Sequence, residues 1–181
     1  MLHLKNITAG NPKTAEQYQM TKQHGITWLF SEDDQNWYEE LKNFASDTIK
    51  MVYTGDGRVV WVGKDVTGIE PRNASVIEVP DITANRRITV PGYWFYRDDK
   101  FVFDYKLKAE DERDALLQRV SIMTSEWEKD LLLGLISDDD REKLKAYRIY
   151  AKSLQAMDFS TITDKSSYNA IEWPVSLEAS S

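Results

Sequence analysis

The sequence contains no cysteine and only two histidines, His3 and His24, in 181 residues. Without cysteine the chain can form no disulfide, no thiolate metal site and no cysteine nucleophile. A serine triad would need one of the two histidines beside a buried aspartate, and no Gly-x-Ser-x-Gly elbow accompanies them. We therefore expect no catalytic residue and no enzymatic activity.

The sequence also lacks a long apolar run and an excess of basic residues. No window approaches the roughly 20 apolar residues that a membrane-spanning helix needs, and we expect no secretion signal. Lys and Arg number 23 against 30 Asp and Glu, a net charge of -7, whereas nucleic-acid binders present basic patches to phosphates. We expect neither a membrane span nor a nucleic-acid partner.

Apolar side chains are plentiful, at 41% of the chain, so we expect a folded protein of one domain or two small ones. Up to about residue 105 the pattern indicates short strands and turns. Asn11 and Pro12 are typical of a helix start and Gly25 of its end, between two strands. Gly55-Asp56-Gly57 predicts a β-hairpin turn. The expected strands after the first lie at residues 26–30, 49–53, 58–62, 75–79, 93–96 and 101–105, with a short helix near residues 37–44.

From Lys106 onward the pattern is helical. Residues 109–136 contain no proline, and apolar side chains recur at helical spacing at Leu116, Val120, Met123, Trp127 and Leu131. Ser137, followed by three aspartates, predicts the start of a second helix. The two helices should form an antiparallel hairpin held together by Leu144, Tyr147, Ala151 and Leu154. The sequence therefore predicts an α+β fold, with a mainly β domain over residues 1–105 and a helical domain with an extended tail over residues 106–181.

The hairpin by itself leaves apolar side chains to be covered. These are Leu132, Leu133, Leu135, Ile149 and Tyr150, and the first half of the chain, the tail or another chain could cover them. In the tail, residues 158–168 are polar and should run back over the second helix, so that Ile171 and Trp173 cover the open apolar surface. The alternative is that the tail faces another subunit or a partner.

Two acidic clusters, residues 32–34 and 138–140, contain the carboxylates that Ca²⁺ and Mg²⁺ prefer. Side chains of consecutive residues point in different directions, however, so a solvated turn and a helix cap explain them better. Gly55-Asp56-Gly57 has neither the lysine nor the helix that follow a phosphate-binding loop. We expect no metal and no cofactor.

Aromatic residues make up 12% of the chain, and several are adjacent, as in Tyr93-Trp94-Phe95-Tyr96. In a strand, alternate side chains face opposite sides, so two of these four rings point away from their own core. Tyr and Trp anchor protein interfaces and stack on sugars. The exposed members of Trp61, Tyr93, Trp94 and Tyr96 are therefore candidates for partner contacts, whereas the alternative is a small sheet that fills its core with large rings.

Two long segments carry a resemblance to a known family. They are HLKNITAGNPKTAEQYQMTKQHGITWLFSEDDQNWYEELKNF near the start and DDDREKLKAYRIYAKSLQAMDFSTITDKSSYNAIEWPV near the end. In segment order, in the NPKTxEQYQ and REKLKAYRxYAKxL patterns and in the terminal Trp-Pro, the chain resembles the tail fibre assembly proteins of Mu-like and lambdoid bacteriophages and prophages.

The resemblance implies a phage chaperone that acts in the host cytoplasm during assembly and binds the C-terminal tip of the tail fibre. It implies a variable N-terminal domain that holds the fibre and a helical domain linked to assembly, folding and trimerisation. Retention on the mature fibre and self-association are further expectations. The rival hypothesis is a module at the fibre tip that binds lipopolysaccharide glycans of the host surface through the same aromatic residues.

Overall fold

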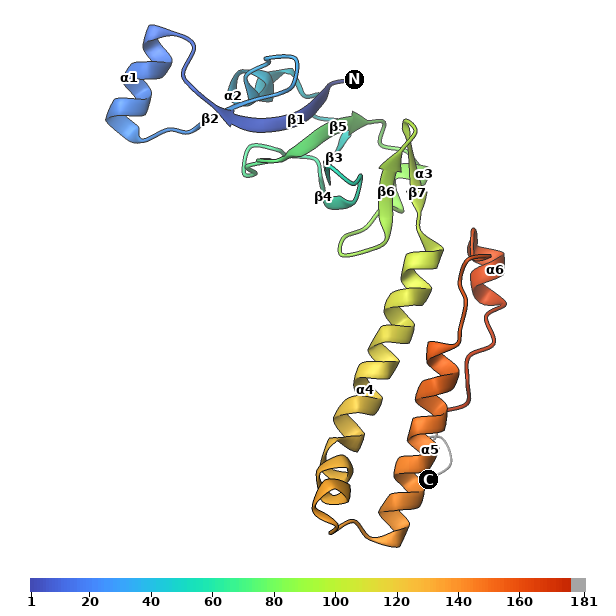
Figure 1. Ribbon diagram of the computed structural model, residues 1–181. Coiled ribbons are helices and arrows are strands. Elements are labelled where there is room, and N and C mark those ends of the chain that lie inside the picture. The colour runs from blue at the N-terminus through green and yellow to red at the C-terminus, as the bar shows by residue number, and fades with distance from the viewer. Residues whose placement is uncertain (177–181) are drawn as a thin grey trace. The chain divides into compact units, whose positions relative to one another are not determined.

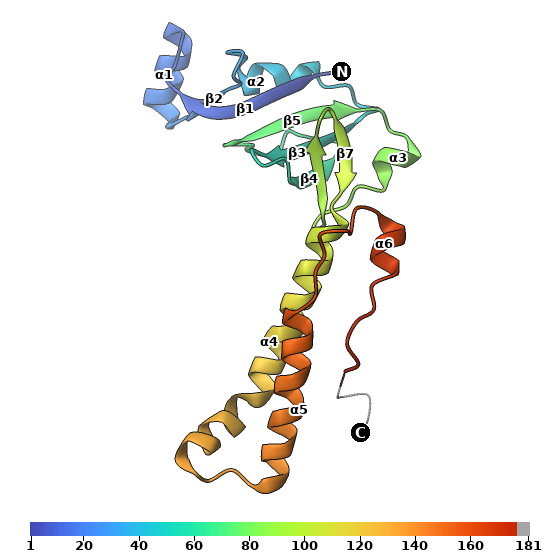
Figure 2. The ribbon, with the colours of Figure 1, turned by 45° about the vertical axis from the view of Figure 1, so that its right-hand side comes forward.

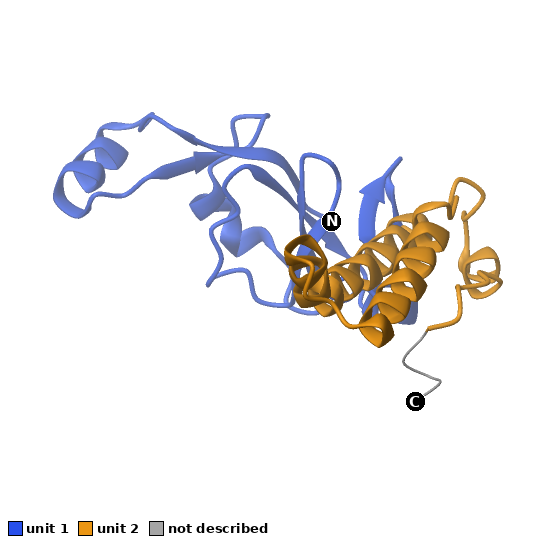
Figure 3. Cartoon of the chain, turned by 60° about the horizontal axis from the view of Figure 1, so that its bottom comes forward, with its two compact units in different colours: residues 1–103 blue, residues 104–181 orange. Residues whose placement is uncertain are grey.

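The computed structural model describes residues 1–176, which form two compact units (Figure 3). The first unit is Met1–Phe103, and the second begins at Asp104, two residues before the boundary expected from the sequence. Within residues 1–176 no helix combines the length and the apolar composition that crossing a bilayer requires. The first unit is mainly β and the second is helical, which confirms the expected α+β fold.

A five-stranded antiparallel sheet organises the first unit, with the strand order β2-β1-β5-β3-β4 (Figure 1). Its strands are β1 (His3–Gly10), β2 (Trp28–Phe30), β3 (Ile49–Thr54), β4 (Val59–Gly63) and β5 (Ala74–Val79). The turn between β3 and β4 contains Gly57 at φ 90°, a backbone conformation that favours glycine. This confirms the predicted β-hairpin. A second hairpin pairs β6 (Trp94–Arg97) with β7 (Lys100–Phe103).

Three short helices accompany these strands: α1 (Ala15–His24), α2 (Trp37–Glu40) and α3 (Thr83–Arg86). A single 3-10 turn, η1 (Leu41–Asn43), follows α2. The predicted start of α1 at Asn11 and Pro12 is wrong, because the side chain of Thr14 accepts a hydrogen bond from the Gln17 amide and caps the helix instead. Gly25 ends α1 in the left-handed conformation, as expected.

The sheet is apolar on both faces, so the first unit has two core clusters. One contains Leu4, Ile7, Leu29, Trp37, Val52, Val66, Ala74 and Val76. The other contains Ile49, Met51, Val59, Val79 and Ile88. Met51 and Val52 are neighbours on β3 and belong to different clusters, as the alternation of side chains along a strand requires.

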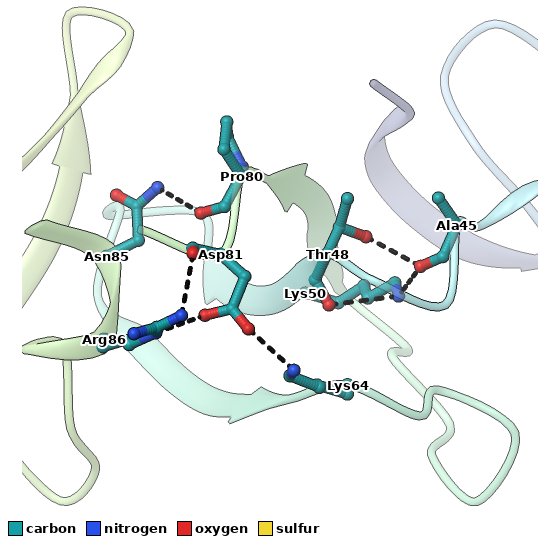
Figure 4. Close-up of polar contacts among 8 residues, drawn as sticks. All are labelled: Ala45, Thr48, Lys50, Lys64, Pro80, Asp81, Asn85 and Arg86. Atoms are coloured by element: carbon teal, nitrogen blue, oxygen red, sulfur yellow. Dashed lines mark hydrogen bonds and ion pairs between the residues drawn. The ribbon is translucent and has the colours of Figure 1, made fainter. Parts of the chain in front are cut away.

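Two buried charged residues, Lys50 and Glu78, lie opposite each other on β3 and β5. Lys50 is only 1% exposed, and its ammonium donates hydrogen bonds to the carbonyl oxygens of Ala45 and Thr48 (Figure 4). The carboxylate of Glu78 accepts hydrogen bonds from Thr48 and from the amides of Leu2 and Ala45. Burial acts to raise the pKa of Glu78, but these hydrogen bonds and the charge of Lys50 outweigh burial and lower it.

The second unit consists of α4 (Tyr105–Leu133), α5 (Asp138–Gln155) and α6 (Lys165–Asn169), with α4 and α5 packed side by side (Figure 2). Gly134 ends α4 at φ 69°, and the side chain of Ser137 caps α5 by accepting from the Asp140 amide, as expected. Helix α4 begins at Tyr105, one residue before the change of pattern expected at Lys106. The reason is that the Asp104 carboxylate accepts a hydrogen bond from the Leu107 amide at 2.9 Å and caps the helix there.

The core of the hairpin is the cluster of Val120, Tyr150 and Leu154. Around it pack Leu116, Leu117, Tyr147, Ala151, Met157 and Trp173, and Leu144 is buried as well. Tyr150 therefore needs no further cover. Met123 and Leu131 were predicted to lie in the buried stripe, but they are 37% and 46% exposed, because the buried face of α4 runs through Val120 and Thr124.

The tail does not run over the second helix as predicted, because α6 packs against α4. The hydroxyl of Tyr168 accepts a hydrogen bond from the Lys108 ammonium and donates one to the Glu112 carboxylate, both at 2.5 Å. Further along, the ring of Trp173 lies 5.7 Å from that of Phe159 and covers the hairpin core. These two contacts tie the tail to the hairpin.

Candidate partner-binding site

The first unit contains a hollow of about 510 Å³ that combines an apolar floor with a charged rim. Its floor consists of Val79, Ile88, Trp94 and Phe101, which belong to the second core cluster or pack against it. Its rim includes His3, Arg87, Tyr96, Asp99 and Lys100. These residues come from β1, β5, β6, β7 and the segment that follows α3.

The β6-β7 hairpin supplies the aromatic side of the hollow. Trp94 pairs with Phe103 and Tyr96 with Phe101, so these four rings lie on one face of the hairpin. Phe95 points to the other face, where it is buried and the guanidinium of Arg97 lies 4.1 Å from its ring centre. The alternation expected for this run of aromatics is present, but Trp94 and Tyr96 are half-buried rather than fully exposed.

Tyr96 occupies the centre of a cluster of rings. Its ring centre lies 4.8 Å from that of Tyr53, 5.0 Å from that of Phe101 and 5.6 Å from that of His3. The Tyr96 hydroxyl donates a hydrogen bond to the Asp99 carboxylate at 3.2 Å. Burial, followed by the hydrogen bond and the negative charge of Asp99, raises the pKa of Tyr96 to about 12.

The opposite side of the hollow is held in place by Asp81. Its carboxylate binds the guanidinium of Arg86 at 2.6 Å and the ammonium of Lys64 at 2.7 Å (Figure 4). The Asn85 amide group donates to the Pro80 carbonyl at 2.8 Å. These contacts fix α3 and the residues that follow it, so that Ile88 reaches the floor of the hollow, where it is 3% exposed.

Two basic side chains of the rim, Arg87 and Lys100, are exposed and make no hydrogen bond or ion pair within the described part of the chain. This distinguishes Arg87 from its neighbour Arg86, whose guanidinium is bound to Asp81. The two carboxylates that line the hollow, in contrast, accept hydrogen bonds within the chain. Glu78 accepts three, and Asp99 accepts one from Tyr96. The rim thus presents two unpaired cations together with the carboxylates of Glu78 and Asp99, above an apolar floor.

Of the four aromatic residues expected to contact a partner, Trp94 and Tyr96 line this hollow. Tyr93 packs against Phe103, with ring centres 6.0 Å apart. Trp61 pairs with Val52 on the opposite face of the sheet and packs on the first core cluster. Sequence reasoning missed His3, Arg87, Ile88 and Lys100, because no local pattern brings them together. Phe101 was visible only as part of the aromatic run.

A second candidate surface lies at the connected ends of α4 and α5. We call it the leucine end, and it consists of Leu131, Leu132, Leu133, Leu135 and Ile149, which are between 46% and 87% exposed. A groove of about 780 Å³ crosses it, with Arg141, Lys145 and Arg148 among its lining residues. Exposed apolar patches of this kind are typical of interaction surfaces.

Neither surface has the features of a catalytic or metal site. Across residues 1–176 no three His, Asp or Glu side chains gather where they could hold a metal ion. His24, the second histidine of the sequence, is an exposed residue at the end of α1. The hollow combines aromatic rings with the unpaired cations of Arg87 and Lys100, and the leucine end exposes aliphatic side chains.

Comparison with known proteins gives a consistent result. The family model described as Caudovirales tail fibre assembly protein, lambda gpK, matches residues 39–178. The chain is 48% identical over 168 residues to the tail fiber assembly protein U' of Escherichia phage Mu, across 90% of this chain and 95% of that protein. A protein of the same name from Escherichia phage P1 is 46% identical with the same coverage. The probable tail fiber assembly protein of Escherichia phage P2 is 40% identical over 164 residues, or 87% of this chain and 94% of the relative.

The family match includes the β6-β7 hairpin, the segment after α3 and the whole α4-α5 hairpin. The relatives are aligned over nearly their full length, so the correspondence is not confined to one unit. It confirms the resemblance seen in the two long sequence segments. The chain belongs to the tail fibre assembly protein family of the Caudovirales, a non-enzymatic family of phage assembly proteins.

Proposed function

We propose that this protein is a chaperone that binds the C-terminal tip of a phage tail fibre and promotes correct folding and trimerisation of the fibre. The observation that carries the proposal is 48% identity, over 90% of the chain, to a protein named for tail fiber assembly. The hollow lined by Trp94 and Tyr96 supports it, since it offers aromatic rings and unpaired cations to a partner. No cofactor enters the proposal.

The physical need for such a chaperone follows from the nature of fibres. Three chains with repetitive structure can associate in a wrong register and then become trapped, because every slipped register still satisfies many contacts. A protein that holds the chain ends fixes the point from which the three chains align. In this proposal the first unit, residues 1–103, holds the fibre, and the work takes place in the host cytoplasm during phage assembly.

In this proposal the helical unit brings the fibre chains together during assembly. Its leucine end exposes four leucines and one isoleucine that nothing within residues 1–176 covers. Burial of this surface between two copies of the chain would remove apolar area from water, which favours association. We infer that the leucine end mediates self-association while fibre chains are brought together, and that retention on the mature fibre depends on the first unit.

Coexpression with the neighbouring fibre gene tests the proposal. The expected result is a soluble, trimeric fibre that copurifies with this chain, and an insoluble fibre when this chain is omitted. Trp94→Ala should weaken copurification, whereas Tyr18→Ala, which removes an exposed aromatic ring outside the hollow, should leave it unchanged. A fibre that is soluble and trimeric without this chain would contradict the chaperone function.

The same proteins test the rival hypothesis of glycan binding. Sugars stack on the open face of an aromatic ring, but Trp94 and Tyr96 are half-buried and contact Phe103 and Phe101. We therefore favour a protein partner. Binding of the isolated chain to lipopolysaccharide glycans, lost in Trp94→Ala, would support the rival, and a glycan array without signal would exclude it.

A further inference from the structure

We propose that the hollow of the first unit binds the free carboxyl end of a polypeptide whose last side chain is apolar. The α-carboxylate binds Arg87 and Lys100, and the last side chain lies on the floor formed by Ile88, Trp94 and Phe101. This inference rests on the proposed function for the identity of the partner, which is a tail fibre chain. It adds the chemical group that is recognised and the residues that recognise it.

Arg87 and Lys100 are the two basic rim residues without a partner in the described structure, whereas the neighbouring Arg86 is bound to Asp81. The two carboxylates that line the same hollow already accept hydrogen bonds, three at Glu78 and one at Asp99. A guanidinium presents parallel N–H donors that match a carboxylate, and an ammonium adds a further donor. An anionic ligand group is therefore favoured beside these two cations.

The floor of the hollow is apolar. Ile88 is 3% exposed, and Trp94 and Phe101 are partly buried on the same core cluster. An apolar side chain that enters the hollow is removed from water at this floor. Polar groups there would lose their hydration without finding partners, because the floor offers aliphatic and aromatic atoms.

The last residue of a chain can supply both groups at once. An internal Asp or Glu carries a carboxylate but has no apolar side chain of its own to fill the floor. The last residue of a chain carries an α-carboxylate and a side chain on the same carbon, so an apolar last residue satisfies the rim and the floor together. Capture of a terminal carboxylate is an established mode of peptide recognition. The partner fibre should accordingly end in an apolar residue.

The experiment uses the full chain and two forms of the last twelve residues of the neighbouring fibre, synthesised as the free acid and as the C-terminal amide. Titration calorimetry should show the acid binding at least tenfold more tightly than the amide. Arg87→Gln and Lys100→Gln should each reduce the preference for the acid without changing the affinity for the amide. Lys42→Gln, which alters an exposed lysine outside the hollow, is the matched control and should keep the preference.

A second arm uses the intact fibre, because a short peptide does not reproduce its fold. The fibre is coexpressed with its natural end, with a Gly-Ser extension at its C-terminus, and with the same extension at its N-terminus. Copurification should be lost only with the C-terminal extension. The inference is overturned if acid and amide bind equally, or if the C-terminally extended fibre copurifies as well as the natural one.

These outcomes separate the inference from the proposed function. If the natural fibre copurifies and is folded only with this chain, but the carboxyl end has no effect, the proposed function stands and the inference fails. If the natural fibre does not interact with this chain at all, the proposed function fails and the inference fails with it. Circular dichroism of both Gln variants establishes that a loss of binding is not a loss of fold.

Discussion

The imidazole of His3 and the hydroxyl of Tyr53 lie 2.6 Å apart, although fifty residues separate them in the sequence. Tyr53 in turn contacts Tyr96, so the first strand, the β3 strand and the β6-β7 hairpin meet at the edge of the hollow. Two groups at this meeting point, His3 and Tyr96, have shifted pKa values.

His3 should make the folded protein less stable at acidic pH. Burial, followed by the charge of Lys5, lowers the pKa of His3 below its ordinary value of 6.5. The unfolded chain therefore takes up a proton at a higher pH than the folded chain, and stability is lost as the pH falls from about 6.5 through the lowered pKa. His3→Gln should lose less stability than the parent between pH 7 and 5 in urea denaturation. Equal losses would show that His3 does not contribute, and His24→Gln is the control.

Tyr96 should ionise at an unusually high pH. With a pKa of about 12, Tyr96 should remain protonated when exposed tyrosines have ionised. Because the folded-state pKa is raised, its contribution to stability is present below about pH 10 and is lost as the pH rises toward 12. A spectrophotometric titration of the phenolate should show a late-ionising tyrosine that is absent in Tyr96→Phe. A normal titration of Tyr96 would contradict the burial seen here.

The third prediction concerns the attachment of α6. Tyr168→Phe removes the hydroxyl that joins Lys108 and Glu112, and leaves their direct ion pair at 3.2 Å. Loss of hydrogen bonds to charged groups should lower the free energy of unfolding by about 1 to 2 kcal/mol. Urea denaturation measures the change, and limited proteolysis should show earlier cleavage after residue 156. Tyr18→Phe, on an exposed tyrosine, should change neither property.

The fourth prediction concerns the leucine end. Leu132 and Ile149 are 87% and 68% exposed, so Leu132→Lys and Ile149→Lys should change the unfolding free energy by no more than about 0.5 kcal/mol. If the leucine end mediates self-association, both variants should shift sedimentation toward the monomer and reduce fibre solubility on coexpression. Association that persists in the double variant would place the self-contact elsewhere. Glu126→Lys, on an exposed residue of α4 outside the groove, controls for added charge.

Much of the fold follows from local patterns. The Gly55-Asp56-Gly57 turn, the cap at Ser137 and the helical periodicity after Lys106 each depend on a few neighbouring residues, and the structure contains all three features. Other expectations failed where several local signals competed. Thr14 rather than the predicted Asn11 caps α1 because its hydroxyl reaches the Gln17 amide, and both residue types can cap a helix.

The direction of the tail shows a different kind of limit. Its polar composition indicated a surface ribbon, but composition does not say which helix the ribbon contacts. Tyr168 selects α4 through Lys108 and Glu112, which are about sixty residues away in the chain. Contacts at such separations depend on the packing of whole elements, so no local pattern could have placed them.

The candidate site divides in the same way. The sequence alone indicated the family, which the comparisons confirm, and the aromatic run that provides Trp94 and Tyr96. Arg86 and Arg87 are equivalent in the sequence, and only the tertiary structure decides that Asp81 binds the first while the second faces the hollow with its charge unpaired. The reason is physical: residue type and spacing set local conformation, whereas the pairing of a charge depends on which distant groups the folded chain brings within a few ångströms.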